Sequence, residues 1–191
     1  MTREGEVKQR RKPSQKYSIT NEKKLAKMFK EATGRVRNEI IVLFYTGMHV
    51  SVYCEPHEFE TVWDGGVLSW MRRKKGMGRP ALVRIPVPKA GFPMFVSKRE
   101  VERAIQEWLN MPQWDRVSRY TVFRDMKKFG KKYGFDGNKQ TFLSPANGRH
   151  TFCLWDLNAE RGNVMAVKAD MKCSLEMIYE NYGLMDERRY G

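Results

Sequence analysis

The hydrophobic positions of the sequence first follow a helical period, from residue 21 to residue 47. They predict two helices, one that runs up to Gly34 and one that ends near Gly47. A third, short helix is expected over residues 50–55, where Pro56 would stop it because proline cannot continue a helix. Residues 21–55 are therefore expected to be helical.

The hydrophobic period then changes to two, which is typical of strands. Residues 59–63 and 67–71 predict two strands joined by a turn at residues 64–66, which read Asp-Gly-Gly. Residues 72–79 form a basic stretch that contains glycine, and residues 81–87 predict a third strand. These segments predict a small antiparallel sheet of three strands.

The remaining sequence returns to a helical period. Three further helices are expected to begin at serine residues that can cap them: Ser97, Ser118 and Ser144. The first of these helices would end at Pro112 and the second at Gly134, and a last helix is expected from about Ser174 to Tyr182. Helices, a three-stranded sheet and helices again make an α+β fold that is mostly α.

Positive charge is the main feature of the composition. The 191 residues include 36 lysines and arginines against 22 aspartates and glutamates, a formal net charge of +14. Such an excess favours a polyanionic partner, and we expect double-stranded DNA. An anionic membrane is not expected, because no apolar run approaches the roughly 20 residues of a membrane-spanning helix. The alternative is a protein that is basic without such a partner, and the sequence leaves self-association open.

The cysteines and histidines are few and widely spaced, and they form neither a disulfide framework nor a zinc motif. They are Cys54, Cys153, Cys173, His49, His57 and His150. We therefore expect an intracellular protein with reduced cysteines and with neither a metal nor a cofactor.

Residues 1–20 lack an apolar period and carry an excess of basic side chains. We expect a flexible arm that lies along DNA phosphates, or else a solvated tail, followed by one domain over residues 21–191. The side chains expected to contact DNA are Arg10, Arg11, Lys12, Arg72, Arg73, Lys74, Lys75, Arg79, Lys127, Lys128, Lys131, Lys132 and Arg149.

Three segments and one tyrosine carry a resemblance to a known family. Residues 43–51 read LFYTGMHVS, residues 74–86 are a Lys-Lys-Gly hairpin leading into a strand, and residues 143–152 read LSPANGRHTF. Tyr179 follows about thirty residues later. In this order they resemble the catalytic domain of tyrosine recombinases, the phage integrases and Xer-type enzymes, over about residues 21–183. The resemblance implies the integrase catalytic-domain fold.

The resemblance also implies a chemistry. In this family a tyrosine attacks a DNA phosphodiester and forms a 3′-phosphotyrosine, two arginines hold the phosphate, and a hairpin lysine protonates the departing oxygen. Tyr179 would be the nucleophile, Arg149 the second arginine, and Lys75 or its neighbour Lys74 the lysine.

Three other positions depart from the family pattern. His49 replaces the first arginine, Ala146 replaces a histidine, and Asp170 stands nine residues before Tyr179, where histidine or tryptophan is expected. A neutral imidazole cannot grip a phosphate as a guanidinium does, and losing one such donor costs about 10²–10³ in rate. Losing an acid–base group costs roughly 10²–10⁴, and Asp170 is expected to repel phosphate. Efficient strand cleavage is therefore not expected.

Three functions remain as hypotheses. The first is a non-enzymatic, largely sequence-independent double-stranded DNA-binding protein with an integrase fold. The second is a divergent but active recombinase that cuts DNA through Tyr179. The third is a non-catalytic partner or regulator of a recombinase. Two structural alternatives also stay open: Arg149 could simply pair with Asp156 or another acid, and Tyr179 could pack in the core.

Overall fold

The computed structural model describes residues 18–72, 80–135 and 142–182. Its elements follow the chain in the order α1 (Glu22–Glu31), α2 (Gly34–Thr46), α3 (Val50–Cys54), β1 (Val62–Asp64), β2 (Val67–Arg72), β3 (Ala81–Pro86), α4 (Lys98–Asn110), η2 (Gln113–Asp115), α5 (Arg119–Gly130), η3 (Lys131–Tyr133), α6 (Pro145–Ala159), α7 (Val164–Met171) and α8 (Leu175–Tyr182). The predicted α+β class with three strands is confirmed. None of the described helices is both long and apolar enough to cross a lipid bilayer.

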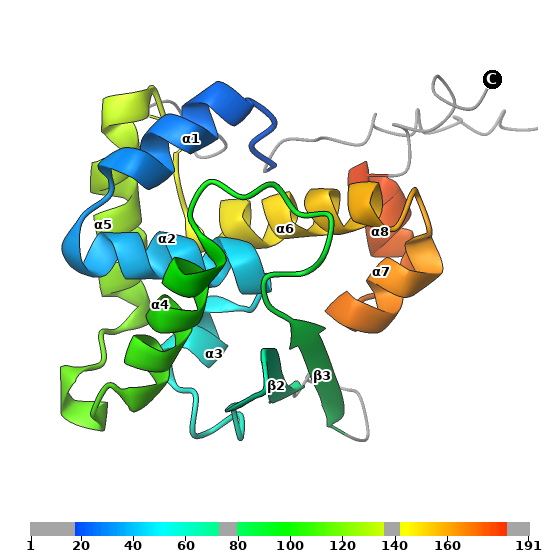
Figure 1. Ribbon diagram of the computed structural model, residues 1–191, viewed down its shortest axis with the longest axis horizontal. Helices are drawn as coiled ribbons and strands as arrows, with labels where there is room; N and C mark the ends of the chain where they lie inside the picture. Colours follow the sequence, from blue (N-terminus) through cyan, green and yellow to red (C-terminus); the bar gives the residue numbers. More distant parts are fainter. Residues whose placement is uncertain (1–17, 73–79, 136–141, 183–191) are drawn as a thin grey trace, which may run out of the picture.

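Helices α2 and α6 pack against each other in the centre of the molecule, with the other helices around them (Figure 1). Residues 39–46 of α2 are all buried, so the last turns of this helix are surrounded by other elements on every side. The close approach requires glycine: a Cβ atom at Gly148 would lie 3.2 Å from the Leu43 backbone. Gly47 ends α2 with a φ of 60°, and a Cβ atom there would lie 2.6 Å from Phe152. The central contact therefore depends on two small residues.

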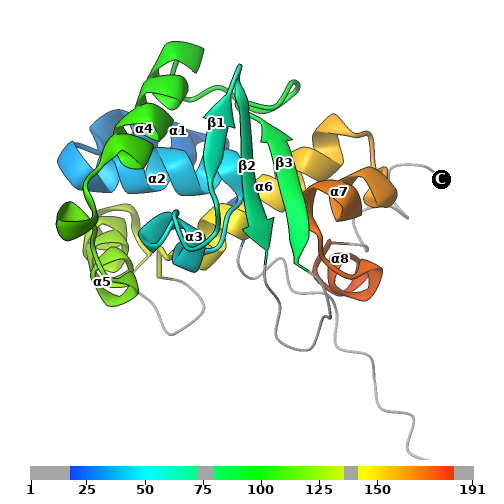
Figure 2. The ribbon, with the colours of Figure 1, turned by 90° about the horizontal axis from the view of Figure 1, so that it is seen from below.

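The three strands form an antiparallel sheet in the order β1-β2-β3. Figure 2 shows this sheet with α7 beside β3. Leu68 and Trp70 of β2 are buried, whereas their neighbours Val67, Ser69 and Met71 are only partly buried, so alternate residues face the helices. Strand β1 begins at Val62, later than predicted, because residues 56–60 form consecutive turns.

The predicted helix starts are confirmed by their caps. The side-chain oxygen of Ser97 accepts a hydrogen bond from the Glu100 N–H at 3.3 Å, and that of Ser118 accepts one from Thr121 at 3.2 Å. Ser144 begins α6 with a capping box. These caps are local in sequence, which is why the sequence alone could locate them.

Helix α7 was not predicted. Its apolar residues lie on several sides rather than in one stripe: Val167 is buried while Met165 is 57% exposed. The start of α7 is set by Asn163, whose side chain accepts hydrogen bonds from the N–H groups of Met165 and Ala166 at 3.1 and 3.2 Å. The capping asparagine was the one signal available in the sequence.

The domain begins before residue 21. Ile19 is buried, and its N–H donates to the Thr151 hydroxyl at 2.9 Å. The Ser18 hydroxyl donates to the His150 carbonyl at 3.1 Å. The end of the predicted arm therefore lies against α6, whereas Arg10, Arg11 and Lys12 lie outside the described residues.

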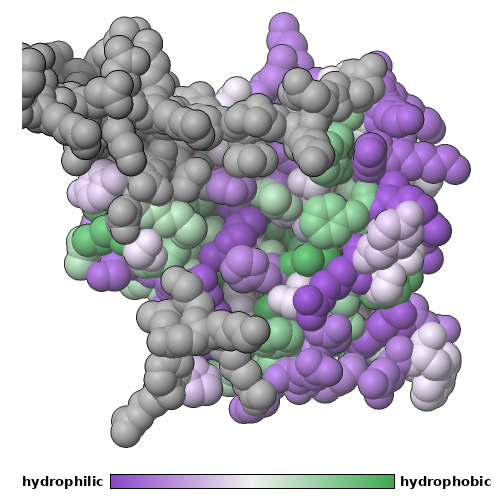
Figure 3. Space-filling model, turned by 180° about the vertical axis from the view of Figure 1, so that it is seen from behind, coloured by the Kyte–Doolittle hydropathy of each residue, from purple (hydrophilic) through white to green (hydrophobic). Residues whose placement is uncertain are grey.

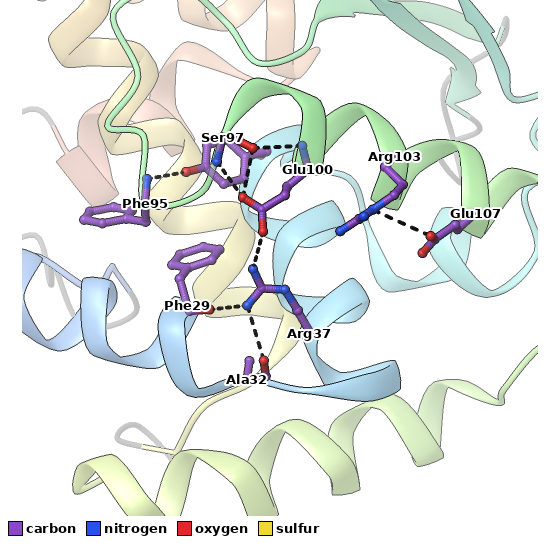
Figure 4. Close-up of polar contacts among 9 residues, drawn as sticks. Phe29, Ala32, Arg37, Phe95, Ser97, Glu100, Arg103 and Glu107 are labelled. Carbon is purple, nitrogen blue, oxygen red and sulfur yellow. Dashed lines mark hydrogen bonds and ion pairs between the residues drawn. The ribbon is translucent and has the colours of Figure 1, made fainter.

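Arg37 of α2 joins three helices on the side of the molecule that bears α4 (Figure 4). One guanidinium nitrogen donates to the carbonyls of Phe29 and Ala32 at 2.6 and 3.3 Å, and the other donates to Glu100 at 2.7 Å. Hydrogen bonds from Ser97, together with Arg37, lower the pKa of Glu100 to about 2. The carboxylate therefore stays charged and holds α1, α2 and α4 together across the physiological range.

Candidate nucleic-acid interface

Arg149 is fixed between the ends of two helices. The capping box of Ser144 and Asn147 starts α6, which places Arg149 in an early turn of the helix. Its Nη1 donates to the carbonyl of Gly47, the residue that ends α2, and its Nη2 donates to the carbonyl of Met171 at 3.3 Å. The guanidinium is half-buried, and carbonyl oxygens hold its orientation.

A second arginine reaches the same carbonyl from the sheet. Arg72 ends β2 and continues the alternate row of Leu68 and Trp70, which faces the helices. Its Nη1 donates to the Met171 carbonyl at 2.7 Å and also to the Lys172 carbonyl. The Met171 oxygen thus bridges Arg72 and Arg149. The sequence predicted Arg72 as a phosphate contact but did not place it beside Arg149. The alternation along β2 could have indicated that Arg72 lies on the same face as Leu68 and Trp70, toward the helices.

His49 lies close to both guanidinium groups. It precedes α3, and its side chain is exposed at the surface. Partial removal of water around the imidazole, and then the positive charges of Arg149 and Arg72, lower the pKa of His49 far below 6.5. The imidazole is therefore neutral at pH 7. Burial and Arg149 also lower the pKa of His150, to about 4.

The carboxylate of Asp170 is paired with a lysine. It binds the ammonium of Lys89, which also binds Asp156 and, at 2.7 Å, Glu160. The expectation that Asp170 repels phosphate was made for a carboxylate without a partner. The ammonium of Lys89 compensates its charge, so the repulsion is weaker than expected. The alternative in which Arg149 pairs with Asp156 is also corrected, because Asp156 binds Lys89.

The Lys89 cluster was missed in the sequence, because its members lie far apart along the chain. Oxygen atoms of the three carboxylates lie within 4.8 Å of one another, a spacing that could also hold a metal ion. The lysine ammonium supplies the positive charge among them. Burial raises the pKa of Asp156 to about 6, and hydrogen bonds to the carboxylates raise the pKa of Lys89 despite its own burial. The cluster fixes α6 and α7 relative to the loop after β3.

Tyr179 is available at the surface. It lies on α8, where Ile178 is buried and Tyr179 is 52% exposed. The alternative in which Tyr179 packs in the core is therefore wrong, because the neighbouring isoleucine takes that place. Helix α8 packs against α7, the helix whose last carbonyls accept hydrogen bonds from the two arginines. Ala146, where the family has a histidine, is also exposed.

Exposed lysines lie at the end of α5. The helix ends at Gly130, earlier than predicted, and continues as the 3₁₀ turn η3. Four predicted DNA contacts lie here and are exposed: Lys127, Lys128, Lys131 and Lys132. The other predicted basic contacts of the hairpin lie outside the described residues: Arg73, Lys74, Lys75 and Arg79. The candidate catalytic lysine is therefore among the residues that the structure does not describe.

These features share one side of the molecule. Figure 2 places α5, α3 and α8 along the same side, with α3 between the other two. Figure 3 shows this side, where hydrophilic side chains line the margin near α5 and also lie in the hollowed middle. The elements that carry the exposed lysines, His49 and Tyr179 (α5, the start of α3, and α8) thus lie along one concave side, on which hydrophilic and hydrophobic side chains both occur.

No protein-family model matches the sequence, and no curated protein matches it. Solved structures do resemble this fold. The XerH site-specific recombinase bound to its difH substrate before cleavage has a TM-score of 0.58 and 16% identity, over 91% of this chain and 53% of that chain. Its post-cleavage complex with palindromic difH has a TM-score of 0.62 and 15% identity, over 92% of this chain and 52% of that chain.

The Tn1549 transposon integrase in complex with a circular intermediate DNA gives a TM-score of 0.56 and 17% identity, over 87% of this chain and 61% of that chain. The chain spans about half the length of the XerH chains, 53% and 52%. The predicted architecture is confirmed by these similarities: the chain has the fold of the tyrosine recombinase catalytic domain.

Proposed function

We propose that this protein binds double-stranded DNA through the concave side that carries Arg149 and the lysines of α5. The observation that carries this proposal is the guanidinium of Arg149, which the carbonyls of Gly47 and Met171 hold in place. Exposed lysines lie on α5, a helix on the same side of the molecule as α3 and α8 (Figure 2). Ammonium and guanidinium groups bind backbone phosphates and release counterions, which is a sequence-independent source of affinity. The structurally similar recombinase and integrase are both complexes with DNA, which supports the same class of ligand.

Duplex binding is tested by fluorescence anisotropy of the full chain on two labelled duplexes of unrelated sequence, over a series of salt concentrations. We expect the logarithm of the binding constant to fall linearly with the logarithm of salt, with a slope of about −0.9 for each phosphate contacted. Both duplexes are expected to give similar constants, because phosphate contacts do not read bases. A flat salt response would contradict the proposal, and absence of binding at low salt would favour the partner or regulator hypothesis.

We further propose that strand cleavage is weak or absent. Ala146 offers no acid or base where the family has a histidine. Asp170 stands where the family has a histidine or tryptophan, and its carboxylate binds Lys89. Phosphate contacts alone are sufficient for binding but not for efficient transfer to a tyrosine.

The second candidate function is an active recombinase, and the exposure of Tyr179 favours it. A nicked suicide duplex, which traps any covalent intermediate, separates the two functions. The non-enzymatic function predicts no protein–DNA adduct after denaturing electrophoresis. An adduct that forms with the unmodified chain and is lost in Tyr179→Phe would establish the second function instead.

A further inference from the structure

We infer that Arg72 is the second phosphate-binding arginine of this site, in place of the arginine that the family pattern puts at position 49. The inference rests on the proposed function, since its ligand is a phosphodiester of bound DNA. It assigns this role to the end of β2 rather than to the junction of α2 and α3. Arg72 then binds phosphate together with Arg149.

The first argument is the shared acceptor. Nη1 of Arg72 lies 2.7 Å from the Met171 oxygen, and Nη2 of Arg149 lies 3.3 Å from the same oxygen. One carbonyl therefore lies between the two guanidinium groups and holds both in place. Two guanidinium groups held side by side can donate to the paired oxygens of a phosphate. Because the carbonyl already orders both side chains, little conformational entropy is lost when the phosphate binds.

The second argument is the local charge. Both Arg149 and Arg72 lower the pKa of His49, so both positive charges act at one place. Among the described residues, no carboxylate forms an ion pair with Arg72, and the nearby acid Asp170 binds Lys89. Two cations held near a neutral imidazole leave positive charge that an anion would compensate.

Arg72 also has a structural role, which the test must separate from binding. Arg72 donates to the last carbonyls of α7, where Lys172 adopts the left-handed conformation. The arginine thereby caps the carboxyl end of this helix. Only Nη1 is used for that contact. Among the described residues, Nε and Nη2 of Arg72 have no hydrogen-bond partner, and these donors remain for a phosphate.

The test compares Arg72→Gln with Arg84→Gln in the full chain. Arg84 lies on β3, is exposed, and faces the other side of the sheet, so both variants lose one positive charge. We expect Arg72→Gln to lower the salt slope by about one unit and to weaken duplex binding about tenfold near 0.1 M salt. Arg84→Gln is expected to change affinity by about twofold or less, because salt screens distant charges.

Arg72→Lys and melting temperatures complete the test. The lysine variant keeps the charge, so the salt slope is expected to return while affinity stays below that of the unmodified chain. A purely structural role predicts a lower melting temperature with an unchanged slope, and this result overturns the inference. Equal effects of Arg72→Gln and Arg84→Gln also overturn it, while the proposed function stands. Failure of the unmodified chain to bind any duplex refutes the proposed function itself.

Discussion

At the scale of single residues, Lys89 is the cation that compensates a cluster of three carboxylates. Its ammonium binds three carboxylates, and one of them, Asp156, is fully buried. Removing the cation would leave acidic groups close together in a place from which water is largely excluded. The cluster is therefore expected to matter more for stability than the surface ion pairs of the same chain.

Lys89→Met tests this expectation. We predict a loss of about 3 kcal/mol in the free energy of unfolding, because the variant breaks a buried pair and leaves its carboxylates uncompensated. The measurement is urea unfolding at pH 7. The matched control is Lys98→Met, since the Lys98 side chain is 70% exposed and lies 3.8 Å from Glu102. The control is expected to cost less than about 1 kcal/mol, and equal losses would contradict the prediction.

Glu39 makes stability depend on pH. It is fully buried in α2; Arg35 lies 3.4 Å from one of its oxygens, but neither oxygen has a hydrogen-bond partner among the described residues. Burial raises the pKa of Glu39 from 4.5 to about 8. The folded state therefore holds this proton more tightly than the unfolded state, and stability is lost as pH rises from about 4.5 to about 8.

Glu39→Gln removes this titration. We predict that the free energy of unfolding of the variant rises relative to that of the unmodified chain as pH rises, by up to about 5 kcal/mol above pH 8. Urea unfolding at a series of pH values measures the difference. Glu107→Gln, whose side chain is 55% exposed, serves as the control and is expected to follow the unmodified chain. Parallel curves for Glu39→Gln and the unmodified chain would show that Glu39 does not titrate in this range.

At the scale of elements, the contact of α2 with α6 depends on how α2 ends. Gly47→Ala is predicted to destabilise the protein by about 3 kcal/mol, because it adds a clash with Phe152 to a strained backbone. Gly34→Ala is the control, since Gly34 has a similar φ of 56° but nothing lies within 4 Å of its Cβ position. We expect about 1 kcal/mol for the control. Thermal unfolding of both variants would refute the prediction if the two losses were equal.

The elements that the sequence revealed are those specified by neighbouring residues. Caps such as Ser97 and Ser144, and the stop at Gly47, act within a few positions and were predicted correctly. Helix α7 was missed because its apolar residues make no stripe. Arg149 and Tyr179 could be proposed from the resemblance to tyrosine recombinases. The approach of Arg72 and the pairing of Asp170 with Lys89 depend on packing between distant segments, which the sequence does not show.

At the scale of the whole molecule, net charge predicts a polyanionic partner but not the side that binds it. The structure places the lysines of α5 on the side shared with α3 and α8 (Figure 2). Helix α1 also carries exposed lysines, but it lies away from α3 and α8 in both views (Figures 1 and 2). This difference allows charge and position to be tested separately.

Charge reversal on α5 is predicted to weaken DNA binding more than the same reversal on α1. The test pair is Lys127→Glu with Lys131→Glu, and the control pair is Lys23→Glu with Lys30→Glu, all at exposed positions. Each pair changes the net charge equally, so a difference in the anisotropy titrations reports position. We expect a loss of more than about tenfold for the α5 pair and a smaller loss for the α1 pair. Equal losses would indicate binding by net charge alone.

The contact of Ser18 and Ile19 with α6 has a practical consequence for measuring ligand binding. It anchors the chain at His150 and Thr151, the two positions that follow Arg149. Thr20 is exposed, whereas all three native cysteines are buried, so a thiol-reactive dye on Thr20→Cys would label one site near this anchor. Such a dye would report occupancy of the arginine site from within the same molecule, without a label on the nucleic acid.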